Sequence, residues 1–165
     1  DVAYTSFEAD GKGNWSFGGL PTVNSTAITG RRVYDLTKGA ITVSGINSAN
    51  AYIVSYWSRS SAANVNGIAA VGGVNIGGWT YYEHKIPAGA STVQVSGGVI
   101  IDELRLFPES AQMTTYTYDP LIGVTSVCSP LNIISYYEYD SGGRLKAIKD
   151  INRNIVKTYD YHHKN

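Results

Sequence analysis

The sequence reads SYYEYDSGGRLKAIKD at residues 135–150, and this stretch predicts a β-hairpin. Tyr137 and Tyr139 are two residues apart, so both rings lie on one face of a strand, whose side chains alternate with period two. Asp140 can start a turn by accepting a hydrogen bond from the backbone two residues ahead, and Gly142-Gly143 supplies positions with positive φ. The segment LKAIKD then forms the returning strand.

This hairpin pattern occurs three times in the last third of the chain. The sequence shows YTYD at 116–119, YEYD at 137–140 and YDYH at 159–162, at a nearly constant spacing. Such a repeat predicts one hairpin per unit, with the tyrosines of one unit stacking on those of the next. The first unit departs from the pattern by continuing with PLIG instead of an Arg-Leu, and the third has His162 where an acid is expected.

The first part of the chain predicts an all-β sandwich or barrel, because many short runs of strand type alternate with turns rich in Gly, Asn and Ser. These runs lie at residues 31–36, 40–46, 51–59, 68–76, 79–86, 92–97 and 99–107. No segment keeps the 3.6-residue period of a helix. After Pro108 the sequence pattern changes from short strand-type runs to the tyrosine repeats, so we expect two domains, residues 1–108 and 109–165.

Composition and motifs exclude several function classes. The 13 basic and 13 acidic residues balance, so no nucleic-acid partner is expected. No apolar run approaches the roughly 18 residues of a membrane helix, so no membrane span is expected. The three histidines lack metal-ligand spacing, Cys128 has no obvious activating base, and no phosphate-binding or nucleophile-elbow motif occurs. We therefore expect a protein that is not an enzyme.

The central repeat carries a resemblance to a known family. YYEYDSGGRL, followed by a KDINRN turn and IVKTYDY, resembles the YD repeats of the Rhs and teneurin type. In that family the repeats wind as a β-ribbon into a hollow shell around a cargo. The units found here are too few to enclose anything, so the resemblance implies one part of such a ribbon. It also implies a larger bacterial protein, secreted or on the cell surface, whose remainder is a partner of this chain.

The first 108 residues resemble the jelly-roll carbohydrate-binding modules of the galactose-binding-like type. The segments that carry this resemblance are Phe7-Glu8, Trp15, GRRVYDL, YIVSYWSR, GWTYYEHKI and IIDELRLF. The resemblance implies a jelly-roll β-sandwich that binds a polysaccharide or surface glycan.

Alternation along AYIVSYWSR places Trp57 and Arg59 on the face that carries more polar residues. Aromatic rings stack on sugar rings, and polar side chains bind the hydroxyls. The candidate sugar-binding residues are Trp57, Arg59, Tyr81, Glu83 and Gln94. The alternative for Trp57 is an ordinary core residue, since buried Trp is normal in a sandwich.

Two acids are candidates for a structural calcium site. In the modules that this chain resembles, an acid near the first strand and an acid in the last strand share a calcium ion with backbone carbonyls. Glu8 and Asp102 occupy these positions. Calcium requires six to eight oxygen ligands, which carbonyls can complete. The alternative is that both are ordinary surface acids at strand ends.

Two functions follow from these expectations. The first is a non-catalytic glycan-binding module of a larger YD-repeat protein. The second is a structural or assembly module of an Rhs-like protein, with no small-molecule ligand.

Overall fold

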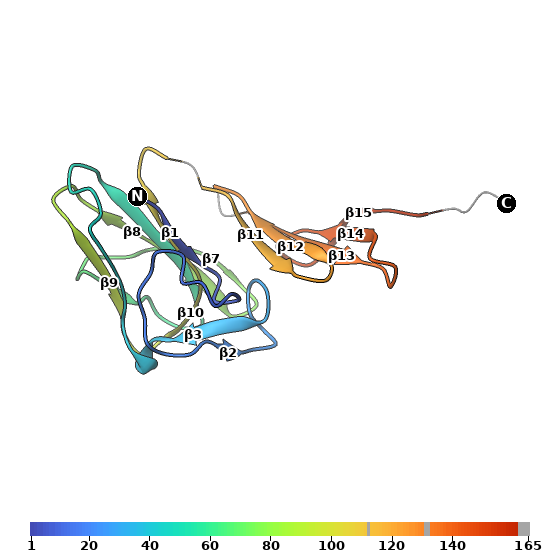
Figure 1. Ribbon diagram of the computed structural model, residues 1–165, viewed down its shortest axis with the longest axis horizontal. Coiled ribbons are helices and arrows are strands. Elements are labelled where there is room, and N and C mark those ends of the chain that lie inside the picture. The colour runs from blue at the N-terminus through green and yellow to red at the C-terminus, as the bar shows by residue number, and fades with distance from the viewer. Residues whose placement is uncertain (112, 131–132, 162–165) are drawn as a thin grey trace. The chain divides into compact units, whose positions relative to one another are not determined.

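The chain divides into two units, Asp1–Gln112 and Met113–Asn165, each built from antiparallel strands (Figure 1). The structure is a computed structural model and describes residues 1–111, 113–130 and 133–161. His162, the irregular position of the third repeat, and His163 lie outside the described residues. The expected boundary at Pro108 falls at the end of a strand, and Glu109 still bonds to the first unit through its N–H and the Ala51 carbonyl. The first unit therefore continues past Pro108.

The first unit contains a large sheet and a small one. In the large sheet the strand order is β2-β3-β10-β5-β8-β7, and β1 also pairs with β10. Its strands are β1 (Ala3–Thr5), β2 (Thr22–Val23), β3 (Arg32–Asp35), β5 (Tyr52–Ser58), β7 (Val71–Ile76), β8 (Trp79–Ile86) and β10 (Ile100–Pro108). The small sheet has the order β4-β9-β6, with β4 (Ile41–Ser44), β9 (Thr92–Ser96) and β6 (Asn64–Val65). A 3-10 turn, η1 (Leu36–Lys38), follows β3.

One hydrophobic core draws on both sheets of the first unit. Tyr52, Val54 and Tyr56 of β5 join the same buried cluster as Ile41 of β4 and Val93 of β9. The alternation predicted for the β5 segment is therefore confirmed, because these side chains face the small sheet while Trp57 lies outside this cluster. The all-β prediction is confirmed as well, although the short strands β1, β2 and β6 were not predicted.

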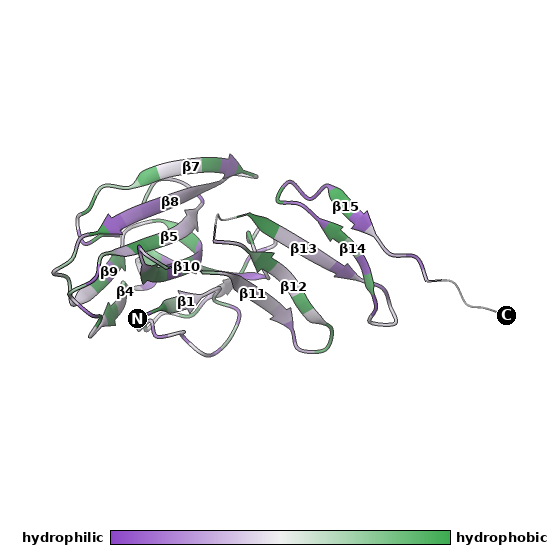
Figure 2. Cartoon of the chain, turned by 90° about the horizontal axis from the view of Figure 1, so that it is seen from above, coloured by the Kyte–Doolittle hydropathy of each residue, from purple (hydrophilic) through white to green (hydrophobic). Residues whose placement is uncertain are grey.

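The second unit is a five-stranded antiparallel meander. Its strands follow one another in sequence order: β11 (Thr115–Asp119), β12 (Gly123–Cys128), β13 (Ile134–Tyr139), β14 (Leu145–Lys149) and β15 (Ile155–Thr158). The stretch at residues 135–150 forms the β13–β14 hairpin, as predicted. Figure 2 shows apolar residues at the start of β15, the strand at one edge of this sheet.

The acid of each turn acts as expected. Asp119 Oδ1 accepts the N–H of Leu121 at 2.9 Å, and Asp140 Oδ1 accepts the N–H of Gly142 at 2.9 Å. Gly143 has φ +77°, the left-handed conformation that the glycine pair was expected to supply. Within the part of the chain that the structure describes, no helix is long and apolar enough to span a membrane.

Candidate functional site

Three of the five predicted sugar-binding residues lie together on the large sheet, on the face opposite the core. Trp57 and Tyr81 are direct partners in the β5–β8 register, with ring centroids 5.5 Å apart. Glu83 lies two residues along β8, and its Oε1 accepts a 2.6 Å hydrogen bond from the Tyr81 hydroxyl. Burial and the bond to Glu83 raise the pKa of Tyr81, so this hydroxyl stays neutral and donates.

Trp57 is fully buried, with an exposed fraction of 0%. The loop at residues 24–31 is tied to this end of the face, because Trp79 Nε1 donates to the Thr26 carbonyl at 2.6 Å and Asp102 accepts the N–H of Ile28 at 3.0 Å. Among the described residues, the Trp57 indole N–H has no hydrogen-bond partner. The prediction that Trp57 lies on an exposed sugar-binding face is therefore wrong. Alternation predicted its face correctly but could not predict that this position is covered, and the burial agrees with the alternative that Trp57 is an ordinary buried residue.

The other two candidate sugar-binding residues, Arg59 and Gln94, do not join Trp57, Tyr81 and Glu83 in one binding surface. Arg59 Nη1 donates to the Gly77 carbonyl at 3.1 Å, and its guanidinium carbon lies 5.4 Å from the Trp79 ring centroid. Arg59 therefore stabilises the turn between β7 and β8. Gln94 lies on β9 of the small sheet, where its backbone N–H donates to the Asn66 side chain. The four of these residues that lie in strands are thus divided between two sheets, and Arg59 directly follows β5.

Glu8 and Asp102 hold the same loop, in an arrangement that we call the carboxylate clasp. Asp102 is 0% exposed, and its Oδ2 accepts the backbone N–H groups of Ile28 and Thr29 at 3.0 and 3.2 Å. Glu8 Oε1 accepts the backbone N–H groups of Arg31 and Arg32 at 2.7 and 2.5 Å. Asp102 is therefore not the surface acid of the alternative interpretation.

The close approach in the clasp depends on a glycine. Gly30 has φ +59°, and a Cβ built on it would lie 2.3 Å from the Glu8 carboxyl carbon. A larger residue would push the loop away from Glu8, so the clasp needs glycine here.

The electrostatics of the clasp are unfavourable to an ionised Asp102. Burial raises the pKa of Asp102 well above its ordinary value, and the nearby charges of Glu103 and Glu8 raise it further. The hydrogen bonds from the Thr29 and Glu103 backbone oppose this rise. Burial and the neighbouring acids outweigh these hydrogen bonds, so folding favours the protonated form of Asp102.

The clasp does not fit calcium as the residues lie. Carboxylate oxygens are suitable ligands, but calcium needs six to eight oxygens. Both Asp102 oxygens and Glu8 Oε1 already accept backbone N–H groups, including the Glu103 N–H at 2.8 Å. Across the described ranges, no group of three or more His, Cys, Asp or Glu side chains could hold a metal ion. Calcium stays a prediction that chelation can test.

Two buried charges beside the clasp were missed in the sequence. Glu103 and Arg105 are each 2% exposed and form a 3.7 Å ion pair. Tyr4 and Thr29 donate hydroxyl hydrogen bonds to Glu103 at 2.9 and 2.5 Å, and the Glu103 backbone has φ 54°. The sequence feature that could have revealed this pair is the charged DELR segment inside the otherwise apolar strand IIDELRLF, since buried charges need partners.

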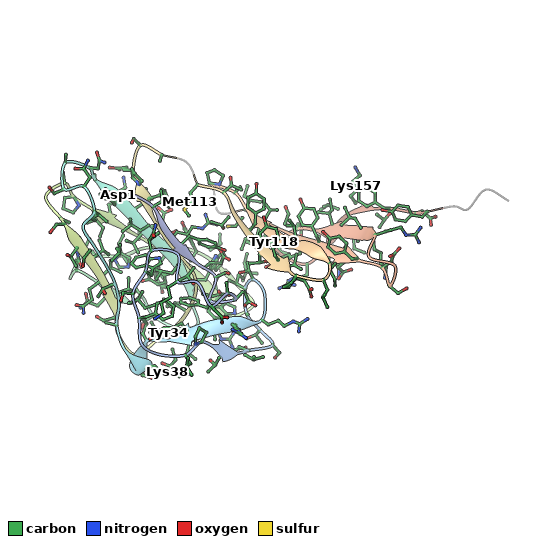
Figure 3. All side chains as sticks on the ribbon, in the orientation of Figure 1. Asp1, Tyr34, Lys38, Met113, Tyr118 and Lys157 are labelled. Atoms are coloured by element: carbon green, nitrogen blue, oxygen red, sulfur yellow. The ribbon has the colours of Figure 1, made fainter. Side chains whose placement is uncertain are left out.

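The second unit contains a repeated contact that we call the tyrosine junction. The Tyr139 hydroxyl donates to the Val124 carbonyl at 2.7 Å, and the Tyr161 hydroxyl donates to the Leu145 carbonyl at 2.8 Å. In both cases the second tyrosine of one repeat reaches the start of the returning strand of the preceding repeat. Tyr118, the equivalent residue of the first repeat, is 63% exposed (Figure 3). Sequence reasoning predicted stacking between repeats but not this hydrogen bond.

No known family model and no curated protein sequence matches the chain.

Proposed function

We propose that this chain is a structural, assembly module of a larger Rhs-like YD-repeat protein, secreted or on the cell surface. The first unit is a jelly-roll sandwich that carries the repeat hairpins, and the hairpins are one part of a longer β-ribbon. This function needs no small-molecule ligand and no catalytic residues.

The tyrosine junction is the observation that carries this proposal. It occurs with the same partners at both boundaries between repeats, Tyr139 to Val124 and Tyr161 to Leu145. A contact that recurs at each boundary joins any number of identical units, as in other repeat architectures. The cation–π contact from Arg144 to the Tyr161 ring, at 4.4 Å, adds a second link across the later boundary.

The edge strand β15 supports an extendable ribbon. Ile155 and Val156 are 60% and 62% exposed, and β14 is the strand that pairs with β15 in the described sheet. The Tyr159 N–H donates to the Lys146 carbonyl, and Thr158 is paired in register with Ala147. Because adjacent residues of an antiparallel strand point their backbone groups to opposite sides, the N–H of Thr158 faces away from β14. An exposed apolar edge of this kind favours pairing with another strand.

The glycan-binding function receives less support from the geometry. It depended on Trp57 as a stacking platform, and this side chain is buried. Arg59 and Tyr81 also have partners within the protein. Glycan binding stays a prediction, and a glycan array with the purified chain tests it. A reproducible hit would favour it over the structural function.

The experiment that tests the structural function extends the ribbon by one strand. Residues 162–165 are replaced by a copy of residues 140–150, and amide hydrogen exchange is measured. We expect the N–H of Thr158 to become protected and the second unit to melt at a higher temperature, since β15 gains a partner. The matched control carries Ser at the copied positions of Leu145 and Ile148. Equal exchange in the extended and control proteins would refute the proposal.

A further inference from the structure

A buried histidine of the first unit lies in a chain of hydrogen bonds. His84 belongs to β8 and is 1% exposed. Its Nδ1 lies 2.9 Å from the Ile68 carbonyl oxygen, and its Nε2 lies 2.8 Å from the hydroxyl oxygen of Tyr56 in β5. That hydroxyl also accepts the N–H of Ala63 at 2.8 Å. We call these four residues the histidine latch.

The latch holds the segment that carries β6. Residues 59–70 run from the end of β5 to the start of β7, and they include Ala63, Ile68 and the two residues of β6. Val65 of β6 is 0% exposed, belongs to the hydrophobic core and pairs with Val95 of β9. His84 and Tyr56 lie in the large sheet, whereas β6 lies in the small one. The latch therefore ties the large sheet to the segment that adds β6 to the small sheet.

The partners of the ring determine which nitrogen of His84 carries the proton. A carbonyl oxygen only accepts hydrogen bonds, so Nδ1 is the protonated nitrogen of the neutral ring. Nε2 therefore accepts the hydrogen of the Tyr56 hydroxyl. The Tyr56 oxygen keeps a lone pair for the Ala63 N–H, so each donor of the latch has an acceptor. This arrangement requires that His84 is neutral.

A second proton on His84 disrupts this pattern. Nε2 then becomes a donor, and the Tyr56 hydroxyl must direct its hydrogen to another acceptor. The structure offers the Ala63 carbonyl oxygen, which lies 3.5 Å from that hydroxyl, at the limit of a hydrogen bond. Protonation thus exchanges a short hydrogen bond for a weak one and places a charge in the interior, which is costly without a charged partner.

The surroundings of His84 do not supply that partner. Glu83 and Lys85, its charged neighbours on β8, point to the opposite face because side chains alternate along a strand. The residues around the ring are uncharged: Tyr82 on β8, Val54 and Tyr56 on β5, and Ala63 and Ile68 on the 59–70 segment. Burial lowers the pKa of His84, the bond to the Ile68 carbonyl opposes this shift, and no charge on a described residue contributes. Burial also raises the pKa of Tyr56, so its hydroxyl stays neutral.

We propose that the histidine latch is an acid-sensitive device: protonation of His84 at Nε2 breaks the bond from Tyr56 and releases the 59–70 segment from the large sheet. The step takes one proton from solvent and changes no covalent bond between heavy atoms. Release withdraws Val65 from the core and uncovers the side of β9 that pairs with β6. The first unit is thus closed at neutral pH and opens locally in mild acid. This inference does not depend on the proposed function, because the whole latch lies in the first unit.

The sign of the pH dependence follows from the shift at His84. Its folded-state pKa lies below the ordinary value of 6.5, so folding favours the neutral ring. The stabilisation from this group is complete above that value and is lost as pH falls toward the folded-state pKa. Asp102 acts in the opposite direction, since its raised pKa favours folding in acid. A test must therefore separate the two groups.

The test is NMR on the intact ¹⁵N-labelled chain with His162→Gln and His163→Gln, so that His84 is its one histidine. We expect ring ¹⁵N shifts of the Nδ1–H tautomer at about pH 8 and a titration midpoint below 6.5. After correction for the intrinsic exchange rate, amide exchange at Ala63 should rise by up to about tenfold between about pH 7.5 and 5.5. Exchange in the centre of β8 should not follow it.

The comparison variant is His84→Gln in the same background, which keeps a donor and an acceptor but does not titrate. We expect the corrected exchange at Ala63 to lose its dependence on pH in this variant, while the contribution of Asp102 is the same in both proteins. Equal pH dependence in the two proteins would overturn the inference. If His84→Gln does not fold, the ring of the parent protein decides: a proton on Nε2 at about pH 8, or a midpoint at or above 6.5, would refute the latch.

Discussion

Two residues of the first unit, Trp57 and Asp102, lie where the sequence predicted, but their surroundings differ from those expected. Trp57 lies on the predicted face of β5, yet it is fully buried. Asp102 lies in the last strand of the first unit, as expected, yet it bonds to backbone N–H groups of the 24–31 loop. Asp102 therefore contributes to holding the loop and Trp57 is packed in the interior, so substitutions at either should act on stability.

Trp57→Ala should lower the free energy of unfolding of the first unit by about 3–5 kcal/mol, because it leaves a large cavity in a packed site. Leu20→Ala, at a residue that is 78% exposed, is the control and should change it by less than about 0.5 kcal/mol. Denaturant unfolding followed by circular dichroism measures both. A folded Trp57→Ala protein with wild-type stability would contradict the buried role.

The pKa of Asp102 predicts a pH dependence. Its folded-state pKa is raised above the ordinary value of 3.8, so folding favours the protonated acid. The stabilisation from this group is complete below that value and is lost as pH rises through the folded-state pKa. We expect the stability of the wild type relative to Asp102→Asn to fall as pH rises above 4. Denaturant unfolding at several pH values measures it, and a difference independent of pH would contradict the assignment.

At the scale of elements, the repeats are joined by backbone pairing and by one recurring side-chain bond. Asp119 and Asp140, which follow the first two tyrosine pairs, close their turns, and in the two later repeats a tyrosine hydroxyl donates to a carbonyl of the preceding repeat. The two tyrosines of the second repeat therefore have different roles, although both lie in β13.

Tyr139→Phe should lower the stability of the second unit by about 0.5–1.5 kcal/mol, because it deletes the hydrogen bond to the Val124 carbonyl and keeps the ring. Tyr137→Phe is the matched control on the same strand, since no hydroxyl hydrogen bond is found for Tyr137 among the described residues. Amide exchange in β12 and β13 measures the difference. Equal effects of the two substitutions would argue against a distinct role for the second tyrosine.

At the scale of the whole molecule, a unit of two antiparallel sheets and a five-stranded meander follow one another in one chain. The first unit has a core shared by two sheets, while the meander is one sheet whose edge strands are β11 and β15. No metal is needed to explain how the carboxylate clasp closes, because backbone N–H groups bind both acids.

Chelation tests that conclusion on the intact chain. We expect EDTA to leave the melting temperature of the first unit unchanged, because a ligand stabilises a fold only if it binds the folded state. Gly30→Ala is a positive control for loss of the clasp and should lower the melting temperature with or without EDTA. A decrease with EDTA that added calcium reverses would show that the folded chain binds calcium, and loss of that effect in Asp102→Asn would place the ion at the clasp.

The sequence alone determined the strands, the turns and the repeat, because these depend on local chemistry. Side chains alternate with period two along any strand, and an acid followed by glycines closes a turn wherever it occurs. Only the tertiary structure decided which side chains are covered and which acids meet. Trp57 is fully buried, and Gln94 lies on the other sheet. The clasp joins Glu8 and Asp102 through contacts distant in sequence, which follow from sheet order and not from local pattern.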